Sequence, residues 1–281
     1  MPYNMMRSRT LLSPFAVEGV GLHTGAAVRV EVCPVSTPCG RVFIREGVEI
    51  PATVDNVTET RRCTTLGRVG QTISTVEHLL AALLLADIAA VRVVVDGPEL
   101  PALDGAALQW FSLINTAGVC PLDGECPVIA ITETEWFHDG ESDFFLFPAP
   151  ALHVYAALDV PGTIARQRMV GGPVAEQDVR TQMLRARTWG LEREVQALRD
   201  AGLAQGGSLE NAVILSETGF LNDQVWPDEP AWHKVLDLLG DLALTGAHIA
   251  GGILAVRAGH RSHLALARYL RRQMPGISSL P

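Results

Sequence analysis

The stretch AWHKVLDLLGD, residues 231–241, combines an apolar helical pattern with three evenly spaced polar groups. His233, Asp237 and Asp241 are four residues apart, and in an α-helix each such step drifts by only about 40° around the axis. A His and an Asp one turn apart present two ligands to a single cation, and both residue types suit a catalytic zinc site. A metal-free surface pair is the alternative. The intervening Leu and Val residues favour an interior position, where unpaired charge is costly.

A third ligand is expected from the stretch TVEHLL, in which His78 directly follows Glu77 within a run of Leu and Ala residues. A Glu beside a zinc-bound His can remove a proton from water as a general base. The alternative is a capping box between Ser74 and Glu77, in which Glu77 only closes the start of the helix. These residues by themselves leave both interpretations open.

Two further histidines lie in stretches that contain glycine. His260, in AVRAGHRSH, comes directly after a predicted strand and turn. Asp241 could orient it and raise its pKa, which would make it a general acid, whereas a solvated loop histidine is the alternative. The stretch VEGVGLHTG, residues 17–25, lacks the strand–GxGxxG–helix context of a phosphate loop and predicts a tight turn that exposes His23.

The order of the predicted elements indicates two related α+β halves. The first half is predicted to contain strands at 26–35, 40–46 and 89–97 and helices at 74–88 and 103–118. The second is predicted to contain strands at 128–137, 143–149, 152–160 and 251–259 and helices at 176–186, 191–202 and 231–241. The 103–118 helix has Asp104 as its expected N-cap and Gly118 as its end. We therefore expect one domain at 1–125 and a second at 126–281, with the candidate ligands divided between them.

The composition describes an ordinary globular chain of 281 residues, with 48% hydrophobic and 19% charged residues. A net charge of −9 argues against nucleic-acid binding. The basic run at 267–273 is expected to be a solvated helix end, with an anionic ligand or a membrane surface as the alternative. Five cysteines without a CxxC motif predict reduced thiols. Without a run of 18 apolar residues or a signal-peptide pattern, we expect a cytoplasmic protein with no transmembrane segment. We also expect a monomer.

Several stretches together resemble the UDP-3-O-acyl-N-acetylglucosamine deacetylases, the zinc amidases that commit a precursor to lipid A. The matching stretches are GVGLHTG (19–25), ISTVEHLLAAL (73–83), PELPALDGAA (98–107), RARTWG (185–190), GLAQGGSLENAVIL (202–215), HKVLDLLGDL (233–242) and GH (259–260). They occur in the order of that family and cover nearly the whole chain. The resemblance implies two α+β halves whose helices lie between two sheets.

The resemblance also implies roles for the residues already singled out. It implies a zinc ion bound by His78, His233 and Asp237. It implies that Glu77 is the general base and that His260, steadied by Asp241, is the general acid. In this mechanism water attacks the acetamide carbonyl, and acetate leaves once the sugar amine has received a proton.

Further positions match residues that contact the substrate in that family. Thr188 in RARTWG matches a threonine that helps to hold the oxyanion, and Lys234 matches a lysine that contacts the sugar. Lys234 is the chain's one lysine, and we expect its compact ammonium to point beside the metal toward substrate, where a planar guanidinium would not fit. His23 and Cys63 match positions that line the cleft, and we expect Arg257 to contact substrate as well.

The sequence departs from the family pattern in the regions that would recognise the substrate. Trp189 replaces a phenylalanine, Trp232 replaces an arginine, and the stretch LDVPGTIARQRM, residues 158–169, lacks the aromatic residue that would stack on uracil. We therefore keep two alternatives to the lipid A deacetylase. One is a related zinc deacetylase that acts on another N-acetylated amino sugar or sugar nucleotide. The other is a non-catalytic protein of the same fold that binds a sugar nucleotide or a fatty acid.

Overall fold

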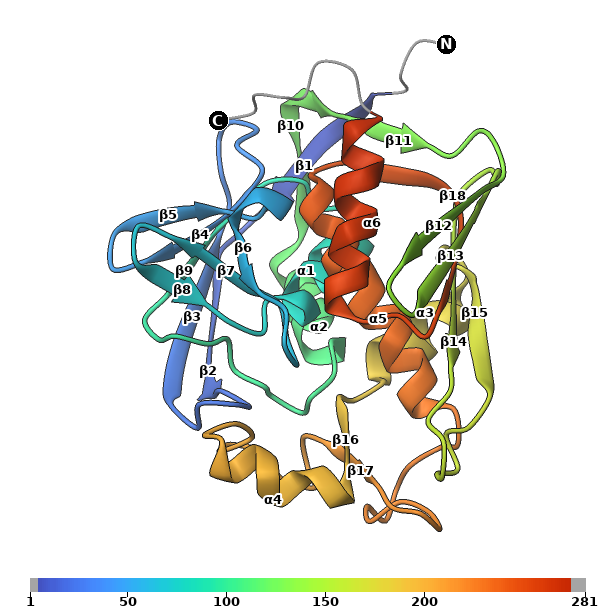
Figure 1. The fold of residues 1–281 in the computed structure, drawn as a ribbon. Coiled ribbons are helices and arrows are strands. Elements are labelled where there is room, and N and C mark those ends of the chain that lie inside the picture. Colours follow the sequence, from blue (N-terminus) through green and yellow to red (C-terminus); the bar gives the residue numbers. More distant parts are fainter. Residues whose placement is uncertain (1–4, 274–281) are drawn as a thin grey trace.

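The computed structural model describes residues 5–273, so the ends of the two predicted domains, 1–4 and 274–281, lie outside the described part. Two β-sheets stand on opposite sides of a helical layer (Figure 1). This arrangement confirms the α+β class with helices between two sheets. None of the helices in residues 5–273 has both the length and the apolar character that a membrane span requires.

The first sheet is formed by residues that precede position 126. Its strands, in spatial order, are β2 (Phe15–Val20), β3 (Ala27–Cys33), β9 (Val91–Val95), β4 (Arg41–Arg45) and β5 (Val48–Pro51). β4 and β9 are parallel, and the other neighbours are antiparallel. Val28, Val30 and Val32 of β3 are buried while the residues between them are exposed, because successive side chains of a strand point to opposite faces.

The second sheet is formed by residues after position 126. Its strands, in spatial order, are β12 (Glu135–Asp139), β13 (Ser142–Phe147), β18 (His248–Val256), β14 (Leu152–Leu158) and β15 (Arg168–Pro173), and β11 (Val128–Ala130) also pairs with β18. The single strand predicted at 128–137 is wrong. Its two parts join different partners, because β11 runs parallel to β18 whereas β12 reaches the sheet edge beside β13. The division of the chain at 125/126 stays a prediction.

Three smaller sheets complete the strands of the described part. They are the pair β1 (Met6–Leu11) and β10 (Val119–Cys126), the three strands β6 (Val57–Glu59), β7 (Thr65–Arg68) and β8 (Gln71–Ile73), and the pair β16 (Trp189–Leu191) and β17 (Val213–Leu215). The last pair is parallel and lies at the end of the molecule, next to α4 (Figure 1).

The helical layer centres on a close contact between two helices. The α-helices are α1 (Glu77–Leu85), α2 (Leu108–Ala117), α3 (Gln177–Arg185), α4 (Glu192–Asp200), α5 (Glu229–Leu242) and α6 (His260–Arg272), with 3-10 turns η1 (Val54–Asn56) and η2 (Ala243–Thr245). A Cβ atom on Gly240 of α5 would lie 2.1 Å from the carbonyl oxygen of Glu77 in α1. The glycine of LLGD therefore allows α5 to approach the start of α1 closely.

One local expectation from the sequence is wrong and two are confirmed. Asp104 does not cap α2, which begins four residues later; its Oδ1 instead accepts a hydrogen bond from the Ala106 N–H. Gly118 does end α2, with a φ of 75° that suits glycine. The basic run at 267–273 is the expected helix end: it closes α6, and Arg268 and Arg272 are exposed, while Arg268 also donates to the Val54 carbonyl and Arg271 pairs with Asp55.

Candidate active site

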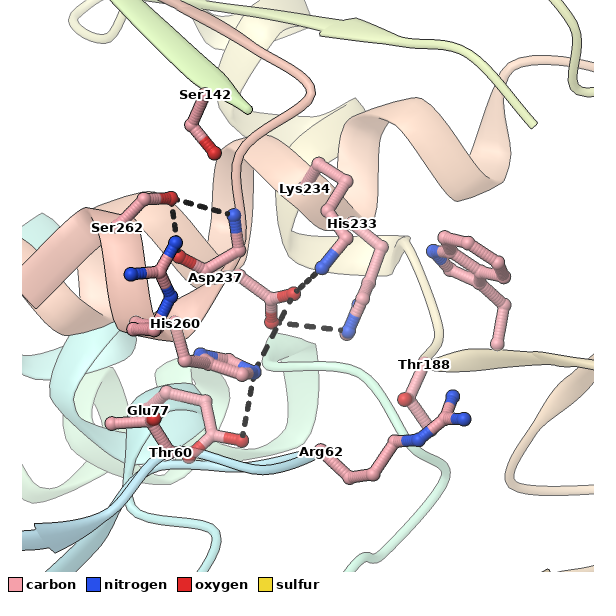
Figure 2. A pocket seen from close by; sticks show the side chains of 13 residues that line it. Thr60, Arg62, Glu77, Ser142, Thr188, His233, Lys234, Asp237, His260 and Ser262 are labelled. Atoms are coloured by element: carbon pink, nitrogen blue, oxygen red, sulfur yellow. Dashed lines mark hydrogen bonds and ion pairs between the residues drawn. The ribbon is translucent and has the colours of Figure 1, made fainter. Parts of the chain in front are cut away.

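The three candidate metal ligands come together where α1 and α5 meet. One ligand atom from each of His78, His233 and Asp237 lies within 4.8 Å of the others, and all three residues are buried. Asp237 Oδ1 is 3.2 Å from His233 Nε2 and 4.0 Å from His78 Nε2. Two residues of α5 and one residue of α1 thus face a common point; His233 and Asp237 of this set are drawn in Figure 2.

The hydrogen bonding around this point fits a bound cation. His233 Nδ1 lies 3.0 Å from the Ala186 carbonyl, an acceptor, so that nitrogen carries the ring proton and Nε2 presents a lone pair. Asp237 Oδ1 has no hydrogen-bond donor in residues 5–273. Two buried electron-pair donors, Nε2 and Oδ1, therefore face each other, an arrangement that a positive ion between them would stabilise.

Burial also keeps His78 in the state that a ligand requires. The loss of solvation and the neighbouring His233 lower the pKa of His78 to about 3, so its ring is neutral at physiological pH. The other oxygen of Asp237, Oδ2, accepts a hydrogen bond of 2.7 Å from Lys234 Nζ. The residues fit a metal with two neutral imidazoles and one carboxylate as ligands.

Glu77 is the first residue of α1, and its carboxylate points into the same space. Its Oε2 accepts a hydrogen bond of 3.1 Å from the Thr64 N–H. The capping box with Ser74 is absent: α1 has no side-chain cap, and Ser74 Oγ instead accepts from the Thr65 hydroxyl. Burial raises the pKa of Glu77 to about 8, so this carboxylate takes up a proton readily, as a general base must.

His260 is buried at the first position of α6, so the alternative of a solvated loop histidine is wrong. Its Nδ1 donates to Asp241 Oδ2 over 2.8 Å, and its Nε2 lies 4.0 Å from Glu77 Oε1 and 4.0 Å from Asp237 Oδ2. Burial alone would lower the pKa of His260, but the charges of Asp241 and Asp237 outweigh burial and raise it to about 9. His260 can therefore hold a proton to donate.

A polar cavity of about 350 Å³ opens onto these groups (Figure 2). Its wall includes the proposed base Glu77, the proposed acid His260 and the candidate ligands His233 and Asp237. Arg62, Thr188 and Lys234 line it as well. The Thr188 N–H donates to the Gly105 carbonyl over 2.8 Å, which fixes this residue at the cavity wall. Lys234 also lies over the ring of Trp189, with Nζ 5.9 Å from the ring centre.

A second cavity, of about 420 Å³, adjoins the first and is mainly apolar. It shares Arg62, Thr188 and Trp189 with the polar cavity. The rest of its wall includes Leu22, His23, Val195, Leu198, Leu209, Ile214 and Leu221. Most of this wall belongs to the β16–α4–β17 segment and the loop that follows it. No residue from 158–169 lines either of these two cavities.

The remaining candidates occupy different places. His23 lines the apolar cavity, and its N–H donates to Glu99. Cys63 is buried beside Thr65 and Thr75, and burial together with the charge of Glu77 raises the pKa of its thiol to about 12. Arg257 lines neither cavity: it pairs with Asp143 at 3.6 Å, and its side chain is 57% exposed.

Several site residues escaped the sequence analysis. Glu99 accepts hydrogen bonds from His23, Thr24 and Thr75 and thereby holds the turn that carries His23. Thr64 and His263 both bind Asp241. Only His263 had a readable signal, because it lies three residues after His260 and hence on the same helical face.

Comparison with known proteins shows the family of this chain. A model of the family described as UDP-3-O-acyl N-acetylglycosamine deacetylase matches residues 8–272. A UDP-3-O-acyl-N-acetylglucosamine deacetylase of Thermosynechococcus vestitus is 40% identical over 271 residues, which is 94% of either chain. The enzyme of the same name from Anaeromyxobacter dehalogenans is 38% identical, covering 92% of this chain and 86% of its own, and that from Synechocystis is 38% identical, covering 92% and 96%. The chain belongs to the UDP-3-O-acyl-N-acetylglucosamine deacetylase family.

Proposed function

We propose that this protein is a zinc-dependent hydrolase that removes acetate from the N-acetyl group of UDP-3-O-acyl-N-acetylglucosamine, a step of lipid A biosynthesis. The observation that carries the proposal is the buried set of His78, His233 and Asp237, with the unpartnered Asp237 Oδ1. Zinc bound there would act as a Lewis acid and make water a better nucleophile. The family membership supplies the substrate class.

The chain's own residues would perform the proton transfers. Glu77 takes a proton from the attacking water, and a bond forms between the water oxygen and the acetamide carbon. Thr188 lies on the cavity wall where its hydroxyl could donate to the developing oxyanion. His260 Nε2 then gives its proton to the sugar nitrogen, the C–N bond breaks, and acetate leaves. The separation of 4.0 Å between Glu77 Oε1 and His260 Nε2 supports this proposal, because both atoms could reach one small reacting group.

The cavities suggest how the substrate lies. The apolar cavity adjoins the polar one at Thr188 and Trp189, so an acyl chain attached near the reacting amide could enter it. Lys234, at the wall of the polar cavity, would contact the sugar as its compact ammonium allows. His23 would line the apolar part of the cleft, and Cys63, which lines neither cavity, would support the cleft from behind. The contact of Arg257 with substrate stays a prediction, because its side chain lines neither cavity.

A related deacetylase with a different N-acetylated amino sugar as substrate is the second candidate. The observation that favours it is the stretch 158–169, which contains Val160, Pro161 and Gly162 and contributes to neither cavity wall. Uracil recognition through that stretch therefore lacks support in this chain, whereas every residue of the proposed hydrolytic centre is present.

Metal analysis combined with acetate release tests these proposals. Stoichiometric zinc with rapid release of acetate from UDP-3-O-acyl-N-acetylglucosamine supports the first function, and release only from other acetylated sugars supports the second. A binding protein of the same fold would bind ligand without releasing acetate. Absence of metal in active protein would contradict both enzymatic proposals. The monomeric state and the cytoplasmic location stay predictions, and analytical ultracentrifugation checks the first of them.

A further inference from the structure

Asp241 is a buried carboxylate that accepts hydrogen bonds from three different residues. Its Oδ1 accepts from the Thr64 hydroxyl over 2.5 Å. Its Oδ2 accepts from His260 Nδ1 and from His263 Nδ1, each over 2.8 Å. Asp241 and Thr64 are fully buried and His263 is 1% exposed. The orientation of this carboxylate is thus fixed from both sides, by a loop of the first half and a helix of the second.

Thr64 binds both Glu77, the proposed base, and Asp241, the partner of the proposed acid His260. Its hydroxyl binds Asp241, while its backbone N–H donates to Glu77 Oε2 over 3.1 Å. Its own carbonyl accepts from the Val76 N–H, next to Glu77. One residue therefore sets the position of the base carboxylate and of the carboxylate that orients the acid.

His263 lies one turn after His260 on α6, and its ring stands edge-on to the His260 ring at 6.0 Å. The ring of Phe144 also packs against the His263 ring, and the centres of these two rings are 6.3 Å apart. Because an ionised carboxylate oxygen can only accept hydrogen bonds, both histidines must carry hydrogen on Nδ1. The Nε2 atom of His260 is then the site at which this ring gains and loses its second proton.

This inference rests on the proposed function. We propose that Thr64 and His263 are positioning residues of the hydrolysis, which lock the Asp241 carboxylate so that His260 keeps one ring orientation and one tautomer, with Nε2 directed at the leaving nitrogen. Neither residue lines either of the two cavities described above. Their loss should therefore reduce kcat while leaving KM and zinc content unchanged.

Matched substitutions test each hydrogen bond. Thr64→Val keeps the backbone N–H and the shape but removes the hydroxyl, and Thr64→Ser keeps the hydroxyl. His263→Leu removes the donor, and His263→Asn keeps an N–H at the position of Nδ1. We expect kcat to fall about 10- to 100-fold in the Val and Leu variants, and the Ser and Asn variants to regain most of it. An unchanged kcat in folded, zinc-loaded Val and Leu variants overturns the proposal, as does a parallel loss of zinc or rise in KM.

A second measurement does not depend on turnover. In protein labelled with ¹⁵N-histidine, we expect slowly exchanging Nδ1–H signals from His260 and His263, with the His263 signal lost in His263→Asn and both signals shifted in Thr64→Val. Two such signals without acetate release would contradict the proposed function and leave the positioning arrangement intact. Acetate release without these protected signals would contradict the positioning inference alone.

Discussion

The proposed catalytic cluster and the apolar cavity beside it are built in contrasting ways. The cluster consists of the buried side chains at the meeting of α1, α5 and α6, namely Glu77, His78, His233, Asp237, Asp241 and His260, none of which is more than 8% exposed. In the apolar cavity, Leu209 and Leu221 are 47% and 46% exposed. The neighbouring helix α4 has no buried residue.

This contrast separates the chemistry from the recognition of substrate. The cluster lies on helices of the main core, so its geometry is fixed by the same packing that stabilises the fold. The cavity is walled by a peripheral segment with few buried contacts, a kind of region that opens locally at low free energy. Among the departures from the family pattern, Trp189 lines the apolar cavity, and Val160 and Ala165 of 158–169 pack with Leu191 in the same peripheral region. Trp232, in contrast, lies on α5 directly before His233.

The largest effect should come from removing a ligand. His233→Ala deletes one of the three proposed ligands, and we expect the purified protein to lose both zinc and acetate release, since two remaining ligands would hold the ion poorly. His138→Ala is the matched control, because His138 is exposed on β12 and pairs only with Asp143 in the described part. Full zinc content in His233→Ala would remove His233 from the ligand set.

Glu77→Ala separates catalysis from metal binding within the same cluster. Since Glu77 is assigned as the base and not as a ligand, zinc should stay bound while turnover falls about 10²- to 10⁴-fold. Metal analysis and single-turnover acetate release check both expectations. Loss of zinc in this variant would show that Glu77 is itself a ligand and that the assigned role is wrong.

The ion pair between Arg187 and Glu229 connects α5, which carries part of the catalytic cluster, with the chain that enters the wall of the apolar cavity. Glu229 is fully buried at the start of α5 and accepts from the Arg187 backbone N–H and guanidinium, at 3.1 Å and 2.8 Å for its Oε1, directly before Thr188. Replacing one partner of a buried pair is costly, so Glu229→Ala should lower the free energy of unfolding by about 3 kcal/mol. In contrast, Glu18→Gln, which breaks an exposed pair with Arg29, should change it by less than about 1 kcal/mol. If urea unfolding gave equal losses of free energy for Glu229→Ala and Glu18→Gln, the buried Arg187–Glu229 pair would stabilise the fold no more than an exposed pair does.

Lys234→Arg tests the boundary between the regions. Lys234 contacts the carboxylate of Asp237 in the cluster and the ring of Trp189 in the cavity wall. Because a planar guanidinium differs in shape from a compact ammonium, we expect zinc content to stay the same and KM to rise about tenfold, equivalent to about 1.4 kcal/mol of binding. A lowered zinc content would place Lys234 among the residues that support the metal.

The sequence predicted the cluster far better than it predicted the cavity. The spacing of His233, Asp237 and Asp241 is a local property of one helix, so a helical pattern suffices to find it. The hydrogen bonds of Thr64 and Glu99 to distant residues depend on how loops fold over the core, and no sequence period encodes them. The N-cap predicted at Asp104 is wrong for a related reason: a local turn, in which Asp104 accepts from the Ala106 N–H, competes with N-capping for the same side chain.

The smallest effect should come from the apolar cavity itself. Leu221→Ser removes apolar surface from the wall, but the side chain is already 46% exposed, so the free energy of unfolding should change by less than about 0.5 kcal/mol. The apolar contact with an acyl chain is worth about 1 kcal/mol for the lost area, so KM should rise about fivefold for a long-chain substrate and stay the same for one with a short acyl group. Leu12→Ser, at an exposed leucine outside the cavity, is the control. If both substrates responded equally, the chain would not lie in this cavity, and the peripheral region would recognise another part of the substrate.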